Sequence, residues 1–201
     1  NTKFKILEAA VQGGNEALFV TIADRLDSLE ALEESKKFQL LEAAVESGNK
    51  TLFNTLADRL GSLEALEESR KYTLIEDAAI SGNEIFFNSL LADHFGSFEE
   101  LFVDEFQIRR LLISAARSGN ESFFNSIDDR TGTLETLHEN YKSHILLKVI
   151  ESGNMVFFNS LENRIGPLDP VQREETDTAQ TQVLISAAES GNKALFNSLE
   201  A

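Results

Sequence analysis

Three histidines are the residues best suited to metal binding or proton transfer: His94, His138 and His144. His138 and His144 are six positions apart, whereas two zinc-binding histidines on one helical face are four positions apart. Glu139 follows His138, so a weak metal site is the alternative to a pair of solvated histidines near helix ends. We expect solvated histidines here, with no metal and no bound cofactor.

Other catalytic and ligand-binding motifs are missing from the sequence. The chain has no cysteine, which excludes disulfides, thiol nucleophiles and thiolate zinc sites. It has no glycine-rich phosphate loop, and the acidic segment 169–177 lacks the central glycine of a calcium loop. A nucleophile would have to be serine or threonine, and one serine position recurs as Ser89, Ser126, Ser160 and Ser198. Because a catalytic residue is not normally present in four copies, we predict no enzyme activity within this chain.

The composition is that of a folded, acidic protein. Of the 201 residues, 42% are hydrophobic and 26% are charged, which is typical of globular domains. The net charge of −16 opposes binding to nucleic acids and anionic membranes. The sequence has no apolar run long enough to cross a bilayer and no signal-peptide pattern. We expect no nucleic-acid partner, no membrane insertion and a cytoplasmic location, with secretion into a host cell as the alternative.

One segment, AAVESGNKTLFNTL at residues 43–56, returns in similar form six times. The repeated asparagines are Asn15, Asn49, Asn83, Asn120, Asn154 and Asn192, spaced by 34, 34, 37, 34 and 38 residues. A period of this length is typical of solenoids, in which each unit packs on the next. We predict a single array of about six units at 4–35, 36–69, 70–106, 107–140, 141–178 and 179–201. Because the chain starts at Asn1 and the last unit is incomplete, we expect a fragment of a longer protein.

Within each unit the pattern predicts two helices joined by a tight turn. Gly48 suits the left-handed conformation that ends a helix, and Asn49 suits the first cap of the next helix. Four residues after each repeated asparagine comes a phenylalanine: Phe19, Phe53, Phe87, Phe124, Phe158 and Phe196. We interpret this row as a continuous core stripe, with a ligand-stacking ladder as the alternative.

The segments between hairpins predict an extra short helix or loop. Ser97 and Glu100 have the spacing of a capping box. We expect a turn near Lys36 and an i,i+4 ion pair between Glu33 and Lys37, repeated as Glu67 with Lys71. His94 falls where other units carry arginine, which predicts a surface cation at a helix end.

Residues 41–61, LEAAVESGNKTLFNTLADRLG, resemble the helix-turn-helix core of the ankyrin repeat. The family pattern has a leucine, then alanines, two free positions, a glycine followed by His or Asn, and an apolar second helix. The resemblance covers about 21 residues of each unit, while the family's Thr-Pro-Leu-His opening and its β-hairpin are missing. It implies an all-α solenoid that binds proteins and has no chemistry of its own. An unclassified α-hairpin solenoid is the alternative.

The candidate binding residues lie where the units differ. They are the cations that enter each unit, one cation in a first helix, and part of an aromatic stripe: Lys36, Lys37, Arg70, Lys71, Phe98, Phe102, Arg109, Arg110, Arg117 and Lys142. A solvated charged face is the alternative for the cations, and core packing is the alternative for the phenylalanines.

We therefore predict a non-enzymatic protein–protein interaction scaffold, acting as a monomer or with weak self-association, whose partner is another protein. A secreted bacterial effector is one protein of which we expect such a scaffold to form part. One alternative is a structural spacer that positions a catalytic domain elsewhere. A second is an enzyme with a pocket near the irregular segment 96–113.

Overall fold

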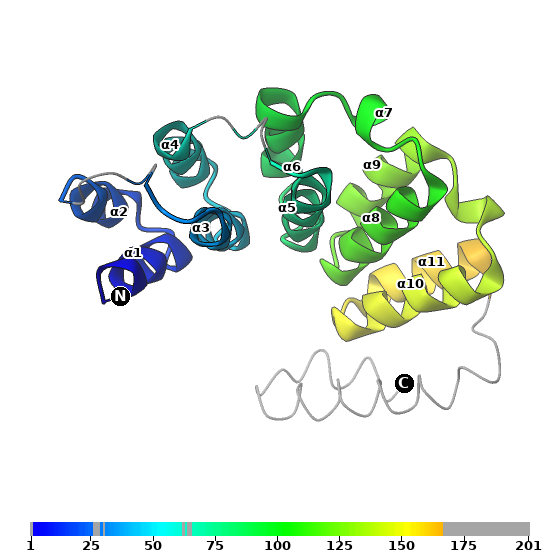
Figure 1. Ribbon diagram of the computed structural model, residues 1–201. Helices are drawn as coiled ribbons and strands as arrows, with labels where there is room; N and C mark the ends of the chain where they lie inside the picture. The colour runs from blue at the N-terminus through cyan, green and yellow to red at the C-terminus, as the bar shows by residue number, and fades with distance from the viewer. Residues whose placement is uncertain (1, 26–28, 30, 62, 64–65, 167–201) are drawn as a thin grey trace, which may run out of the picture. The chain divides into compact units, whose positions relative to one another are not determined.

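The computed structural model describes residues 2–25, 29, 31–61, 63 and 66–166 (Figure 1). Over these residues the chain is helical and has no β-strand, which confirms the predicted all-α class. The chain divides into two compact units, Asn1–Phe102 and Val103–Ala201, here called the N-terminal and C-terminal units. The sixth predicted repeat lies outside the described residues.

The N-terminal unit contains three helical hairpins. Their helices are α1 (Thr2–Gln12) with α2 (Glu16–Ala23), α3 (Glu34–Glu46) with α4 (Lys50–Leu60), and α5 (Glu68–Ile80) with α6 (Glu84–Leu90). The first helix of each hairpin packs on the first helix of the next, so that α3 lies between α1 and α5.

The C-terminal unit contains two hairpins of the same kind. Their helices are α8 (Glu105–Arg117) with α9 (Glu121–Thr131), and α10 (Glu139–Glu151) with α11 (Met155–Ile165). Again the two first helices, α8 and α10, pack on each other. Consecutive hairpins therefore stack within each unit.

The turn inside each hairpin is made by the predicted glycine–asparagine pair. Gly48 has φ 65°, a left-handed conformation in which a side chain is disfavoured. The side-chain oxygen of Asn49 then accepts a hydrogen bond from the backbone N–H of Leu52 at 3.0 Å and caps α4. The capping asparagines of the other described hairpins are Asn15, Asn83, Asn120 and Asn154. The predicted helix stop and start is thus confirmed in five hairpins.

The repeated asparagine also joins its hairpin to the one before it. The Nδ2 of Asn49 donates to the carbonyl oxygen of Gly14 at 2.9 Å, and the Nδ2 of Asn154 donates to that of Gly119 at 2.8 Å. One side chain thus caps its own helix with its oxygen and binds a neighbouring turn with its nitrogen. An aspartate can only accept, so it can supply the cap but not the link between hairpins.

Replacing Asn154 with aspartate should therefore lower the free energy of unfolding by about 1–2 kcal/mol, because the Gly119 carbonyl loses its donor and meets a carboxylate. Urea unfolding followed by circular dichroism measures the loss. Asn15→Asp is the matched control: Asn15 caps α2, and within the described residues its amide nitrogen makes no hydrogen bond. Equal losses in the two variants would assign the effect to capping alone.

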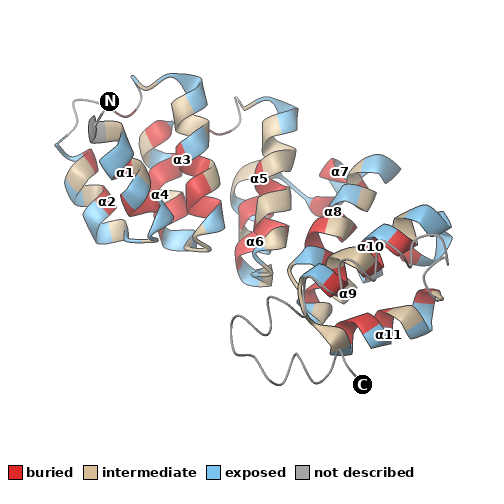
Figure 2. Cartoon of the chain, turned by 90° about the horizontal axis from the view of Figure 1, so that it is seen from below, coloured by how far each residue is buried: buried red, intermediate tan, exposed pale blue. Residues whose placement is uncertain are grey.

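The phenylalanine row forms the core of the hairpins. All five of its described members are buried: Phe19, Phe53, Phe87, Phe124 and Phe158. Rings from successive hairpins meet, with centroids 5.7 Å apart for Phe53 and Phe86 and 5.2 Å apart for Phe124 and Phe157. Figure 2 shows the buried residues as stripes along the helices. The core interpretation is confirmed for these five residues, and Phe196 lies outside the described part.

The fourth repeat starts three residues late, and the structure places these residues in two locations. One extra residue lies inside the third hairpin, where 13 positions separate Asn83 from Gly96 but 12 separate Asn49 from Gly61. It is absorbed by a π-helical turn at Leu91–Phe95 (η2), which continues α6. The other two lie between Gly96 and α8.

These two residues lengthen a linker that contains a short helix, α7 (Phe98–Leu101). The predicted capping box is present: Ser97 accepts from the N–H of Glu100, and Glu100 accepts from the N–H of Ser97, both at 3.2 Å. The linker ahead of α10 contains a 3-10 turn, η3 (Leu134–Thr136). The predicted short helix between hairpins is therefore present in these two linkers.

Candidate partner-binding surface

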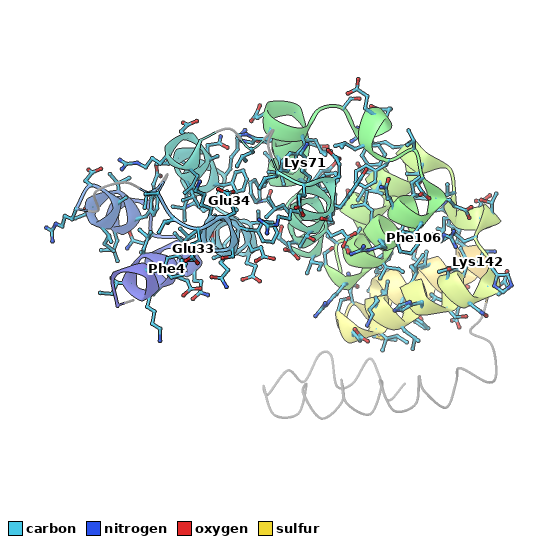
Figure 3. All side chains as sticks on the ribbon, viewed as in Figure 1. Phe4, Glu33, Glu34, Lys71, Phe106 and Lys142 are labelled. Atoms are coloured by element: carbon cyan, nitrogen blue, oxygen red, sulfur yellow. The ribbon has the colours of Figure 1, made fainter. Side chains whose placement is uncertain are left out.

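The lysines at the starts of the first helices are largely covered and pair with glutamates. Lys37, Lys71 and Lys142 (the last two labelled in Figure 3) have side chains only 14–16% exposed, so their aliphatic stems are covered. Each ammonium group pairs with a glutamate three residues earlier, at 2.7 Å, 2.8 Å and 3.1 Å respectively. The positive charge of these residues is therefore matched locally.

The predicted ion-pair partners of Lys37 and Lys71 were wrong by one residue. Lys37 pairs with Glu34, while Glu33 pairs with Lys36 at 3.2 Å. The reason is that Glu33 is the N-cap of α3, with φ −59° and ψ 143°, so the helical i,i+4 spacing does not apply to it. The turn predicted near Lys36 is confirmed, because α3 begins only at Glu34.

Two arginines lie over aromatic rings of a neighbouring hairpin. The guanidinium of Arg70 on α5 is 5.1 Å from the ring centre of Phe38 on α3. That of Arg109 on α8 is 4.3 Å from the ring centre of Tyr141 on α10. Arg70 and Tyr141 occupy equivalent positions in their helices, and so do Phe38 and Arg109. The arginine therefore lies on the later hairpin in the N-terminal unit and on the earlier hairpin in the C-terminal unit. Such cation–π contacts are worth about 0.5–2 kcal/mol and link consecutive hairpins.

The remaining candidates divide into buried and exposed residues. Phe98 and Phe102 are buried, their ring centres lying 4.7 Å apart, so their side chains are part of the core and are not accessible to a partner. Phe106, labelled in Figure 3, is 56% exposed, and the guanidinium of Arg110 lies 5.8 Å from its ring centre. Arg117 is exposed in the last turn of α8.

A second exposed row is not among the candidates predicted from the sequence. It consists of the residues two positions after each repeated asparagine, here called the variable row: Ala17, Thr51, Ile85, Ser122 and Val156. All five are exposed and all five differ in type. Ile85 is 79% exposed and Val156 is 76% exposed. The sequence pattern that could have predicted this row is the change of residue type at one position inside a segment that is otherwise repeated.

Carboxylates gather where α3 packs on α5. Burial and the nearby carboxylates of Glu42, Glu46 and Glu76 raise the pKa of Asp77 to about 6. The pKa of Glu42 is raised by burial and by Glu46, and Arg70 opposes this rise. In the described part of the chain, no group of three or more His, Cys, Asp or Glu residues is arranged to hold a metal ion.

The variant Asp77→Asn should stabilise the protein at pH 7.5 by about 1–2 kcal/mol. The pKa of a carboxyl group raised from 3.8 to about 6 gives stability that is present below pH 4 and is lost as the pH rises through 6. In full this rise corresponds to about 3 kcal/mol, which solvent reduces at a half-buried site. Urea unfolding of the variant and of the wild type at pH 7.5 and at pH 4 measures the difference in their free energy of unfolding. It should disappear at pH 4, and a gain of equal size at both pH values would contradict the electrostatic cause.

His94 is not the surface cation expected from its position. It lies half-buried in η2, with Nε2 3.1 Å from the Oδ1 of Asn54 and its ring centre 5.4 Å from that of Phe53. Burial lowers its pKa, against the opposing effects of Asp93 and Asp58. The imidazole is therefore favoured in its neutral form near pH 7, where it packs on the core.

Comparison of this chain with protein-family models, with curated proteins and with solved structures finds no match. Within the ranges that the structure describes, no helix is both long enough and apolar enough to cross a membrane.

Proposed function

We propose that this chain is a non-enzymatic protein-interaction scaffold in which ankyrin-like hairpins stack into one array and the variable row contacts the partner. The observation that carries this proposal is the contrast between repeated and varying positions. The repeated glycine, asparagine and phenylalanine are used in turns, caps and core, as described above. The exposed position two residues after the asparagine differs in every described hairpin.

The chemistry of the variable row favours a protein partner. Ile85 and Val156 expose large aliphatic side chains, which cost free energy in water unless another surface covers them. Single exposed apolar residues are common in proteins. Ile85 and Val156, however, occupy the same position relative to the repeated asparagine, on α6 of the N-terminal unit and on α11 of the C-terminal unit. A partner that covers this position gains apolar contacts while the repeated residues hold the helices in place.

The recurring serines support a scaffold rather than a hydrolase. The hydroxyl of Ser89 donates to the Oδ2 of Asp93 at 2.9 Å, one turn later on the same side of the helix. A serine nucleophile needs a base that accepts its proton and an adjacent site for the substrate. Asp93 is held by this bond and lies 3.5 Å from Lys50, which lowers the pKa of its carboxyl group further and makes it a weak base.

Site-specific photocrosslinking tests the proposal. A photoreactive amino acid is placed at position 85 or 156 of the full chain, and at the exposed positions 58 and 129 as controls. We expect one discrete protein adduct from positions 85 and 156, absent from the controls and reduced by competition with unlabelled wild-type chain. An unlabelled Ile85→Asp competitor should reduce it less. Adducts of equal yield at all four positions, or at none, would favour a spacer.

A further inference from the structure

The first hairpin exposes two apolar positions that are buried in every other described hairpin. Ile6 is 52% exposed and Leu18 is 46% exposed. The residues equivalent to Ile6 are Leu40, Leu74, Leu111 and Ile145, and those equivalent to Leu18 are Leu52, Phe86, Phe123 and Phe157; all eight are at most 1% exposed. The first hairpin differs from these in having no described hairpin before it. In the third and fifth hairpins the rings equivalent to Leu18, which are Phe86 and Phe157, contact Phe53 and Phe124 of the preceding hairpin in the same unit. Ile6 lies on α1, and the equivalent helices α3, α5 and α10 pack on the first helix of the preceding hairpin in the same unit. The two positions therefore face the place of a preceding hairpin.

Two polar residues of the first hairpin also lack the contacts that their equivalents in the second hairpin make with the preceding hairpin. In the second hairpin, Asn49 donates to the Gly14 carbonyl, and Arg59 pairs with Asp24 of the first hairpin at 2.7 Å. Their equivalents in the first hairpin are Asn15 and Arg25. Within the described residues, neither the amide nitrogen of Asn15 nor the guanidinium of Arg25 makes a hydrogen bond or ion pair.

We propose that this open face, formed by Ile6, Asn15, Leu18 and Arg25, binds a further helical hairpin of the same repeat type that precedes α1 in the polypeptide. A terminal repeat that ends an array has a polar outer face, whereas this face retains the apolar and polar contacts of an internal repeat. The occupant offers a turn carbonyl to Asn15, a carboxylate to Arg25 and an apolar surface to Ile6 and Leu18.

The occupant is placed in the same polypeptide because the contacts repeat with the period of the chain. Asn49 binds the turn of the hairpin whose asparagine lies 34 residues earlier, and Asn154 binds the turn of the hairpin just before its own. A preceding hairpin in register with this period would meet the open face as α1 and α2 meet α3 and α4. This surface is separate from the variable row, so the inference goes beyond the proposed function.

The test supplies such a hairpin by fusing a second copy of residues 35–68 ahead of residue 1, which keeps the 34-residue period. The copy brings equivalents of Gly48 and Asp58 to the places that Gly14 and Asp24 occupy for the second hairpin. We expect the fusion to raise the thermal midpoint and the hydrogen-exchange protection of α1 amides. Leu18→Ser should lower the midpoint by less than about 1 °C in the parent chain and by about 5 °C or more in the fusion.

The control is Ile85→Ser, an exposed aliphatic residue outside the open face, which should have the same small effect in both chains. Equal effects of Leu18→Ser in parent and fusion, with unchanged α1 protection, would overturn the proposal. So would a parent chain that sediments as a dimer and becomes monomeric with Leu18→Ser, because a second copy would then cover the face. If the serine variant of the fusion fails to fold, Leu18→Ala is used for the same comparison.

Discussion

Replacing Phe53 with alanine should lower the free energy of unfolding by about 3–5 kcal/mol, because the substitution leaves a cavity at a fully buried position. The ring of Phe53 lies edge-on to Phe86 of the next hairpin and to His94 in η2. Its loss therefore removes two ring contacts with the third hairpin. We expect weaker hydrogen-exchange protection in α4, α5 and α6 together.

Urea unfolding followed by circular dichroism measures the loss, and hydrogen exchange locates it. Ile85→Ala is the matched control, since it also truncates a large apolar side chain in the N-terminal unit but at a position that is 79% exposed. Its effect should stay within about 0.5 kcal/mol. A loss below about 1 kcal/mol for Phe53→Ala would show that this phenylalanine is not part of a tightly packed core. Phe53→Leu, with a smaller cavity, should fall between the two.

The hairpin and its core were predictable because their causes are local. A glycine at φ 65° followed by an asparagine cap needs only neighbouring residues, and the spacing from Asn49 to Phe53 places the ring by helix geometry. The second role of the asparagine was not predictable in this way. Its amide nitrogen binds a carbonyl 35 residues earlier, a contact that exists only once two hairpins have stacked.

The candidate surface was predicted less well, for two physical reasons. A lysine in the sequence is interpreted as an exposed charge, but the side chains of Lys37 and Lys71 are only 16% exposed and pair with Glu34 and Glu68. Their exposure depends on where the helix begins, and one residue at the N-cap changes the ion-pair partner. In addition, the 37-residue spacing does not show where its three extra residues lie, and one of them forms the π-turn of the third hairpin, which places His94 against Phe53.

The variable row shows what the sequence does contain about the surface. Its members were visible as differing letters inside a repeated segment, but only burial distinguishes a position that varies on the surface from one that varies inside the core. Phe98 and Phe102 illustrate the second case, since they occur only in one linker and are nevertheless buried. Variation among repeats therefore identifies candidate binding positions only when it is combined with exposure.

Replacing Arg164 with leucine should lower the free energy of unfolding by about 3 kcal/mol, because it leaves a buried carboxylate without its counter-charge. The guanidinium of Arg164 on α11 pairs with Asp128 on α9, whose side chain is 3% exposed. The other oxygen of Asp128 accepts from the N–H of Leu134 at 3.1 Å and so begins η3. Loss of the arginine should therefore also weaken protection in the turn that leads to α10.

A comparable pair in the N-terminal unit provides the control. Arg59 pairs with Asp24 at 2.7 Å, but that carboxylate is 59% exposed, so Arg59→Leu should cost about 1 kcal/mol or less. Adding Asp128→Asn to Arg164→Leu should recover about 1–2 kcal/mol, since the neutral amide keeps an acceptor for Leu134 and removes the stranded charge. Urea unfolding of these three variants and of the wild type measures both differences. Equal losses for the two arginines, or no recovery with asparagine, would mean that burial of Asp128 does not determine the strength of this link.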